Sequence, residues 1–213
     1  MKLSIVLLAL AVFALTACED PSANSPKATT ADPTAAASPG ETPAARGEAL
    51  KLTPENSKVG FTGSKVTGKH DGGFNDFVGM IDLVNETPGE SSVRVEIDMN
   101  SVWTDNPTVT EHLKTADFFE VEKHPFAIFS STAIKQAAAG GNAFEVTGDL
   151  DLHGVRRAVT FPATIEVNGN AVKVNAEFSI NRREFGIDYA GPTNDLIRDG
   201  VVIRLDLNAP RSK

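Results

Sequence analysis

The sequence predicts an all-β domain of about eight antiparallel strands that closes into a barrel. Apolar and polar residues alternate in many short runs, most clearly from Val93 to Met99, where Arg94, Glu96 and Asp98 separate the apolar residues. Such a period of two places one face of a strand in a core and the other in water. Turn-forming clusters separate the runs: Pro88-Gly89, Gly140-Gly141-Asn142, His153-Gly154 and Asn168-Gly169-Asn170.

The alternating runs occur in the order expected of hairpin-connected strands. They lie around residues 59–61, 77–83, 93–99, 126–134, 144–152, 159–167, 172–180 and 201–207. Half-polar strands of this kind can form a sandwich or a closed barrel. We favour the barrel, because closure removes exposed strand edges and eight strands enclose room for side chains or one slender ligand.

The N-terminus has the features of an export signal. Lys2 precedes an apolar run from Leu3 to Leu15, which has the length of a signal-peptide core and is too short to span a bilayer. The segment Leu15-Thr16-Ala17-Cys18 resembles a bacterial lipobox, in which the Cys thiol takes up a diacylglyceryl group. An ordinary secretory signal is the alternative. We expect residues 1–17 to be a lipoprotein signal peptide.

Cys18 is the single cysteine of the chain, so no disulfide can form within it and acylation would give the thiol a use. We therefore expect anchoring to a membrane on the periplasmic side of a bacterial cell envelope. Residues 18–48 are rich in Pro, Ala, Ser and Thr, which predicts a disordered tether, with the folded domain at 49–213. The net charge of −8 makes nucleic acid an unfavourable partner.

The longest break in the strand pattern runs from Ser101 to Thr132 and predicts a short helix at 107–118. Pro107 suits a first helical turn, and Thr108 with Glu111 fits a capping box. Apolar residues recur at helical spacing at Val109, Leu113 and Ala116. A short amphipathic helix that interrupts a barrel must dock on apolar surface, and the open end of the barrel offers it.

Several segments together resemble the YceI-like family of lipid/polyisoprenoid-binding proteins, over nearly all of residues 49–209. They are KVTGKHDGGF (65–74), IDMNSVWTDN (97–106), EHLKTADFFEVEKHPFAIFSST (111–132), VTGDLDLHGVRRAVTFP (146–162), FSINRREFGI and GVVIRLDL. The resemblance implies a lipocalin-like, extended eight-stranded antiparallel β-barrel. It also implies an apolar pore that holds a long isoprenoid chain, with no cofactor besides this lipid.

Burial of the isoprenoid tail would supply most of the binding energy, on the order of 3 to 4 kcal/mol gross for each five-carbon unit. The candidate pore residues are Phe61, Val95, Ile97, Leu113, Phe118, Phe129 and Phe178. Val109, Leu113 and the Phe118-Phe119 pair are candidates for a gate. The acidic net charge favours a quinone or a neutral lipid over a diphosphate.

Arg182 is the candidate head-group residue, with structural hydrogen bonding as an equal alternative, whereas Arg156 and Arg157 are expected to form a solvated strand end. The four histidines lack the spacing of metal ligands, and no nucleophile elbow, P-loop or dinucleotide motif is present. We therefore expect neither a metal site nor catalysis. The alternatives are an envelope enzyme that acts on a lipid, with His112 or His70 as general base, and a packed structural or stress-related barrel.

Overall fold

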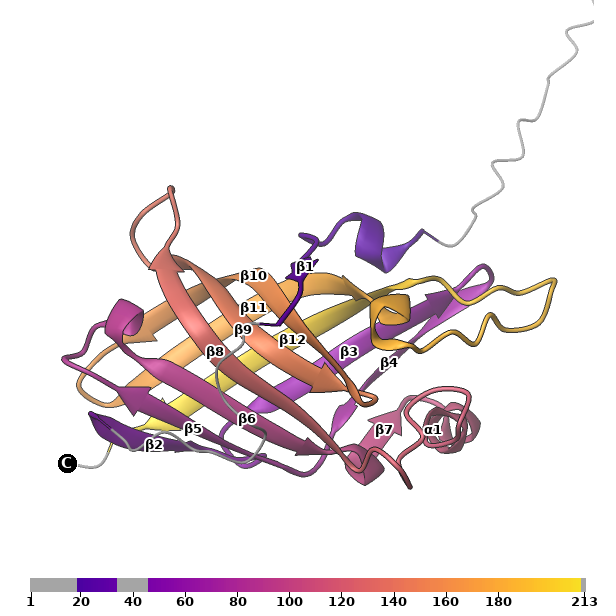
Figure 1. The fold of residues 1–213 in the computed structure, drawn as a ribbon, viewed down its shortest axis with the longest axis horizontal. Coiled ribbons are helices and arrows are strands. Elements are labelled where there is room, and N and C mark those ends of the chain that lie inside the picture. The colour runs from indigo at the N-terminus through magenta and orange to yellow at the C-terminus, as the bar shows by residue number, and fades with distance from the viewer. Residues whose placement is uncertain (1–18, 34–45, 212–213) are drawn as a thin grey trace, which may run out of the picture.

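The computed structural model describes residues 19–33 and 46–211, which form an elongated, curled antiparallel sheet (Figure 1). The expected signal peptide and Cys18 lie outside the described residues. The strands are β1 Thr29–Ala31, β2 Glu48–Leu52, β3 Lys58–Lys65, β4 Gly68–Phe74, β5 Phe77–Leu83, β6 Ser92–Asp98, β7 Val102–Thr104, β8 Phe126–Gln136, β9 Ala143–Leu152, β10 Val155–Val167, β11 Ala171–Asn181 and β12 Gly200–Pro210. The helices are α1 Pro107–Leu113 and the 3-10 turns η1 Pro21–Ala23, η2 Pro88–Glu90, η3 Met99–Ser101 and η4 Arg182–Phe185.

Two bent strands close the barrel. The ladder runs from β5 through β6, β8, β9, β10, β11 and β12 to β3 and then β4. Residues 75 and 76 join β4 directly to β5, and β2, which precedes β3, pairs with β5, so the ladder returns to its start. If β2–β3 and β4–β5 each count as one bent strand, the barrel has eight strands, as the sequence predicts.

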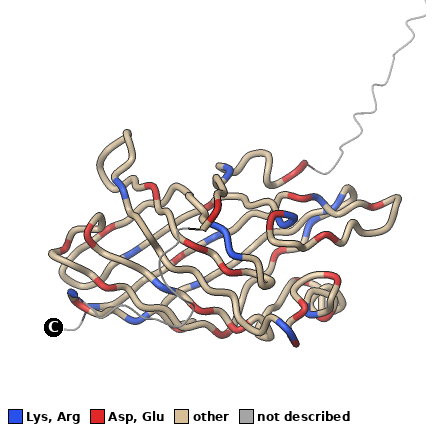
Figure 2. Tube along the Cα trace, in the orientation of Figure 1, with Lys and Arg blue, Asp and Glu red and all other residues tan. Residues whose placement is uncertain are grey.

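The inner face of the barrel carries the apolar residues of the alternating runs. On β6, Val95 is 8% exposed, whereas the outward Arg94 and Glu96 side chains approach each other to 3.5 Å. Charged residues of both signs are spread along the strands and loops of the barrel (Figure 2). None of the helices among the described residues is long and apolar enough to cross a membrane.

The β9–β10 hairpin shows how a local sequence sets the register. Leu152 pairs with Val155, so His153 and Gly154 form a two-residue loop, and their φ angles are +55° and +72°. Positive φ at both positions is typical of the turn that matches the twist of the two strands. The turn places the His153 side chain at the end of the barrel that carries α1.

Helix α1 is shorter than the predicted 107–118, because it ends at Leu113 and residues 114–119 form turns. Its cap also differs from the prediction. The Asn106 side chain, not Thr108, accepts hydrogen bonds from the backbone N–H groups of Thr108 and Val109 at 2.9 and 3.4 Å. With Pro107 already at the first helical position, Asn106 is the residue whose side chain reaches the free N–H groups.

The segment expected to be a disordered tether is ordered from Glu19 to Pro33. Residues Thr29 to Ala31 pair with Thr160 to Ala158 of β10, and the backbone N–H of Ala28 donates to Ser179 at 2.9 Å. Composition predicts disorder here because the segment has few apolar residues. The segment is instead held by backbone hydrogen bonds to β10 and β11, which depend little on its side chains.

Candidate functional site: an apolar cavity along the barrel

An apolar cavity of about 260 Å³ lies inside the barrel. Its lining includes Leu113, the last residue of α1, and Leu83, the last residue of β5. Helix α1 and this end of β5 lie at opposite ends of the barrel (Figure 1). The cavity therefore extends along the long axis of the barrel. Among the described residues, those that line it and carry charge are Arg182 and Arg198.

The structure places every predicted pore residue in the wall of this cavity. They are Phe61, Val95, Ile97, Leu113, Phe118, Phe129 and Phe178. A row of rings crosses the middle: Phe161 stacks on Phe178 with centroids 4.2 Å apart and lies 5.7 Å from Phe129. Strand alternation explains the five that lie on the inner faces of strands, whereas Leu113 is on α1 and Phe118 is in the turns that follow it. Whether they contact a ligand stays a prediction.

Three of the four candidate gate residues line the cavity, namely Leu113, Phe118 and Phe119. Val109 is outside the lining and packs against the cluster of Leu113, Phe118 and Ile187. Leu113 and Phe118 are each 9% exposed. The segment from α1 to Phe119 thus covers this end of the cavity with apolar side chains, and we call residues 107–119 the lid.

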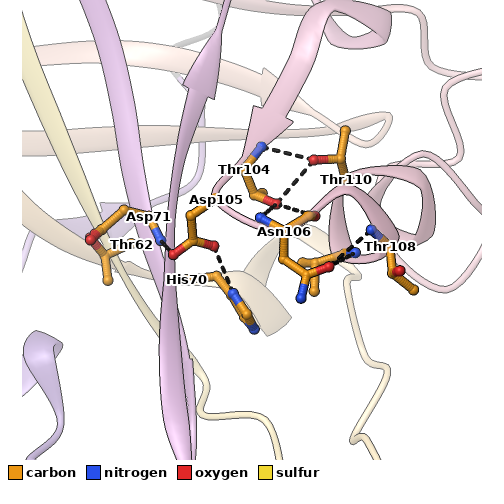
Figure 3. A network of polar contacts seen from close by, with 9 residues as sticks. Thr62, His70, Asp71, Thr104, Asp105, Asn106, Thr108 and Thr110 are labelled. Atoms are coloured by element: carbon orange, nitrogen blue, oxygen red, sulfur yellow. Dashed lines mark hydrogen bonds and ion pairs between the residues drawn. The ribbon is translucent and has the colours of Figure 1, made fainter.

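A polar network fixes the start of the lid to β4 (Figure 3). Asp105 Oδ1 lies 2.7 Å from His70 Nδ1, and the backbone N–H of Asp105 donates to the Asp71 carbonyl at 3.0 Å. The Thr110 hydroxyl accepts from the backbone N–H of Thr104 at 2.8 Å. The His70 contact holds the pKa of Asp105 below its usual value, so the carboxylate stays charged.

Arg182 lies under the loop 186–199, and its side chain is 4% exposed. Its guanidinium donates to the backbone carbonyls of Ile187, Ile197 and Arg198, with distances of 3.3 Å to Ile197 and 3.1 Å to Arg198. It also lies 3.4 Å from Asp199 Oδ1. Burial lowers the pKa of Arg182. These contacts support the structural alternative, because most of the N–H groups are already engaged by the protein.

The Arg156-Arg157 pair differs from a simple solvated strand end. Arg156 Nη2 donates at 2.8 Å to Asp149, whose side chain is 2% exposed, so this ion pair is partly buried. Arg157 lies 3.2 Å from the exposed Asp32 of the N-terminal segment. The sequence did not reveal Asp149, because it occupies a position of β9 that the alternation predicts to face solvent. Only the fold shows that it is buried.

The proposed general bases lie outside the cavity wall, within the part of the chain that the structure describes. His70 contacts Asp105, and His112 Nε2 lies 2.7 Å from Asp117 Oδ2. The other two histidines, His124 and His153, lie together beside Glu120, with ring centroids 5.0 Å apart. Linear spacing did not reveal this cluster, since the β9–β10 turn brings His153 to it from a distant part of the sequence.

The family model described as the YceI-like domain matches residues 50–209. The chain belongs to the YceI-like family. A UPF0312 protein of Pseudomonas putida strain W619 is 36% identical over 132 residues, which cover 59% of this chain and 68% of that protein. YceI-like folds are also found among solved structures.

Two of these structures cover most of this YceI-like chain. Burkholderia cenocepacia BcnA superimposes with a TM-score of 0.67 at 25% identity, over 74% of this chain and 99% of BcnA. A domain from Saccharophagus degradans, described as polyisoprenoid binding and implicated in plant cell wall breakdown, gives a TM-score of 0.61 at 18% identity, over 78% and 100% of the two chains. At that identity the second similarity concerns the fold alone.

Proposed function

We propose that the protein binds a long-chain isoprenoid lipid, either a polyisoprenoid or an isoprenoid quinone, in the barrel cavity and holds or carries it in the bacterial cell envelope without catalysis. The observation that carries this proposal is the apolar wall that continues along the barrel. Membership of the YceI-like family and the polyisoprenoid-binding description of one structural relative support the same class of ligand.

The size of the cavity favours a slender ligand over a fully packed core. An apolar cavity of about 150 Å³ is enough to bind benzene in another protein. A cavity of about 260 Å³ therefore has room for more than one five-carbon isoprene unit. A longer tail would need the lining side chains to move apart, or would extend past one end of the barrel.

The charges around the cavity favour a neutral head group. The two charged residues of the described cavity wall are both engaged by the protein: the Arg182 guanidinium binds backbone carbonyls, and Arg198 Nη1 lies 3.6 Å from Asp20 Oδ2. The net charge of −8 opposes the approach of a diphosphate. A quinone or a neutral isoprenoid therefore suits the site better than a charged one. His70 and His112 are outside the wall, which gives no support to a general base acting on the lipid.

Organic extraction of the purified protein, followed by mass spectrometry, tests the ligand class. We expect about one isoprenoid lipid per barrel from protein produced in a bacterial host that makes isoprenoids. A cytosolic protein of similar size, purified in parallel from the same host, measures non-specific carry-over. Recovery of no stoichiometric lipid, or of straight-chain fatty acids alone, would contradict the proposal.

We also propose that the protein is anchored to a membrane through acylation of Cys18, because the lipobox-like segment before this residue indicates it.

Replacing Cys18 with Ala is expected to release the protein from the membrane fraction into the soluble periplasmic fraction. The thiol is the acceptor of the acyl chains, and two or three such chains are needed for durable anchoring. Fractionation followed by immunoblotting measures the change, and the neighbouring Thr16→Ser variant, which keeps the lipobox pattern, is the control. Continued membrane association of the Cys18→Ala protein would mean that another feature binds the membrane.

A further inference from the structure

The cluster of Glu120, His124 and His153 lies behind the lid, outside the lipid cavity. Glu120 Oε2 is 4.0 Å from Nε2 of His124 and 4.0 Å from Nε2 of His153. One ligand atom from each residue falls within 4.8 Å of the other two. The side chains are 22%, 29% and 15% exposed, so the cluster is sheltered yet open to solvent.

A backbone carbonyl fixes the protonation of His153. Its Nδ1 lies 3.1 Å from the Phe185 carbonyl oxygen, which can only accept a hydrogen bond, so Nδ1 carries the proton. In the neutral form of the ring, the lone pair is then on Nε2, which faces the cluster. This atom is buried and makes no hydrogen bond with any described residue. A histidine held by a carbonyl at one nitrogen, with a free lone pair on the other, is the usual arrangement of a metal ligand.

Glu120 supplies the negative charge on the other side. Its Oε1 pairs with Lys123 Nζ at 2.5 Å, which leaves Oε2 facing the histidines. Glu120 Oε2 is therefore the carboxylate oxygen placed to act as a third ligand beside the two imidazoles.

Gly154 gives His124 the room to reach the cluster. A Cβ atom at position 154 would lie 2.6 Å from His124 Cε1, so a side chain there would displace the ring. The two imidazoles come from separate parts of the chain: His124 lies just before β8, and His153 lies in the β9–β10 turn.

We propose that Glu120, His124 and His153 form a binding site for a first-row divalent transition-metal ion, with zinc as the representative ion. Two imidazoles and one carboxylate match the ligand types that zinc prefers, and water would complete the coordination. Metal–ligand bonds of about 2.1 Å at tetrahedral angles need ligand atoms about 3.4 Å apart. The two Glu120–histidine separations of 4.0 Å, and a separation within 4.8 Å between the histidine atoms, come within reach of that value by side-chain rotations.

An ion at this site would connect parts of the barrel that are far apart in the sequence. Glu120 directly follows Phe118 and Phe119 of the lid, and His153 is joined to η4 through the Phe185 carbonyl. An ion bound by all three side chains would tie the lid to the β9–β10 turn and to η4. The site does not depend on the identity of the lipid.

Calorimetric titration of the chelator-treated, purified protein with zinc chloride tests this proposal. We expect one zinc ion per chain, a rise in Tm on zinc addition, and no binding of magnesium, which prefers oxygen ligands. His124→Ala, Glu120→Gln and His153→Asn should each weaken zinc binding by at least ~10-fold. Asn is chosen at position 153 because it tolerates the φ of +55° found there.

His112→Ala is the matched control, since His112 pairs with Asp117 elsewhere on the surface and should leave zinc affinity unchanged. Far-UV circular dichroism without metal checks that each variant is folded, and the Glu120→Gln variant retains the shape of the native side chain. The proposal is wrong if wild-type protein binds no zinc at micromolar concentrations. It is also wrong if the folded cluster variants bind zinc as tightly as the wild type.

Discussion

An Arg182→Met variant is expected to lose about 3 to 5 kcal/mol of the free energy of unfolding. The substitution keeps an unbranched apolar stem but removes the guanidinium that binds the carbonyls of Ile187, Ile197 and Arg198. Each carbonyl that stays buried without a donor costs about 1 to 3 kcal/mol. The loop 186–199 would lose the hydrogen bonds that join it to Arg182 at the end of β11. Because Ile187 and Ile197 of this loop line the cavity, its loosening would also affect the cavity wall.

Urea unfolding at constant pH measures this loss, and Arg183→Met is the matched control. The Arg183 side chain is 42% exposed and binds Asp199 at 2.6 Å on the surface. Surface ion pairs contribute about 1 kcal/mol or less, so the control should be only slightly destabilised. Equal losses in the two variants would show that the buried contacts of Arg182 are unimportant for stability. An Arg182→Met protein of native stability that lacks lipid would instead identify Arg182 as a head-group contact.

The strands that alternation reveals are those that line the barrel. The run from Val93 to Met99 predicts β6 because each inward side chain is apolar and each outward one is polar. Strand β4 has no such pattern, since its sequence GKHDGGF is polar and rich in glycine. Backbone hydrogen bonds pair β4 with β3 on one side and with β7 on the other, and Gly72 and Gly73 permit the close approach of Trp103 on β7. The bends that join β2 to β3 and β4 to β5 into single strands of the barrel depend on this tertiary pairing and not on local sequence.

The site shows the same division. Inward positions such as Val95 and Phe178 could be named from alternation, because the pattern itself says which face they occupy. The partners of Arg182 are backbone carbonyls of a later loop, which carry no signal in the sequence. The cluster of Glu120, His124 and His153 depends on the β9–β10 turn for its third member. Spacing along the chain cannot reveal a group that only folding assembles.

Replacing Val95 with Trp is expected to reduce the bound lipid to less than about a tenth of the wild-type amount. Val95 lies on the inner face of β6, opposite Phe129 on β8, and both side chains line the cavity. An indole would occupy the space beside the row of Phe129, Phe161 and Phe178 and exclude part of the tail. Exclusion of even one isoprene unit removes on the order of 3 to 4 kcal/mol of gross burial energy, whereas a tenfold loss of affinity needs only about 1.4 kcal/mol.

The matched control is Val78→Trp, which adds the same side chain to the neighbouring strand β5 at a position that is 57% exposed. Extraction and mass spectrometry of the two variants, purified side by side, compare lipid per chain, and thermal unfolding checks that both are folded. A folded Val95→Trp protein that retains the full amount of lipid would mean that the ligand binds elsewhere. If both variants lose lipid equally, the effect comes from the added indole itself and not from the cavity. Loss confined to Val95→Trp would place the isoprenoid tail between β6 and the aromatic row, since the inner-face substitution alone changes the space available there.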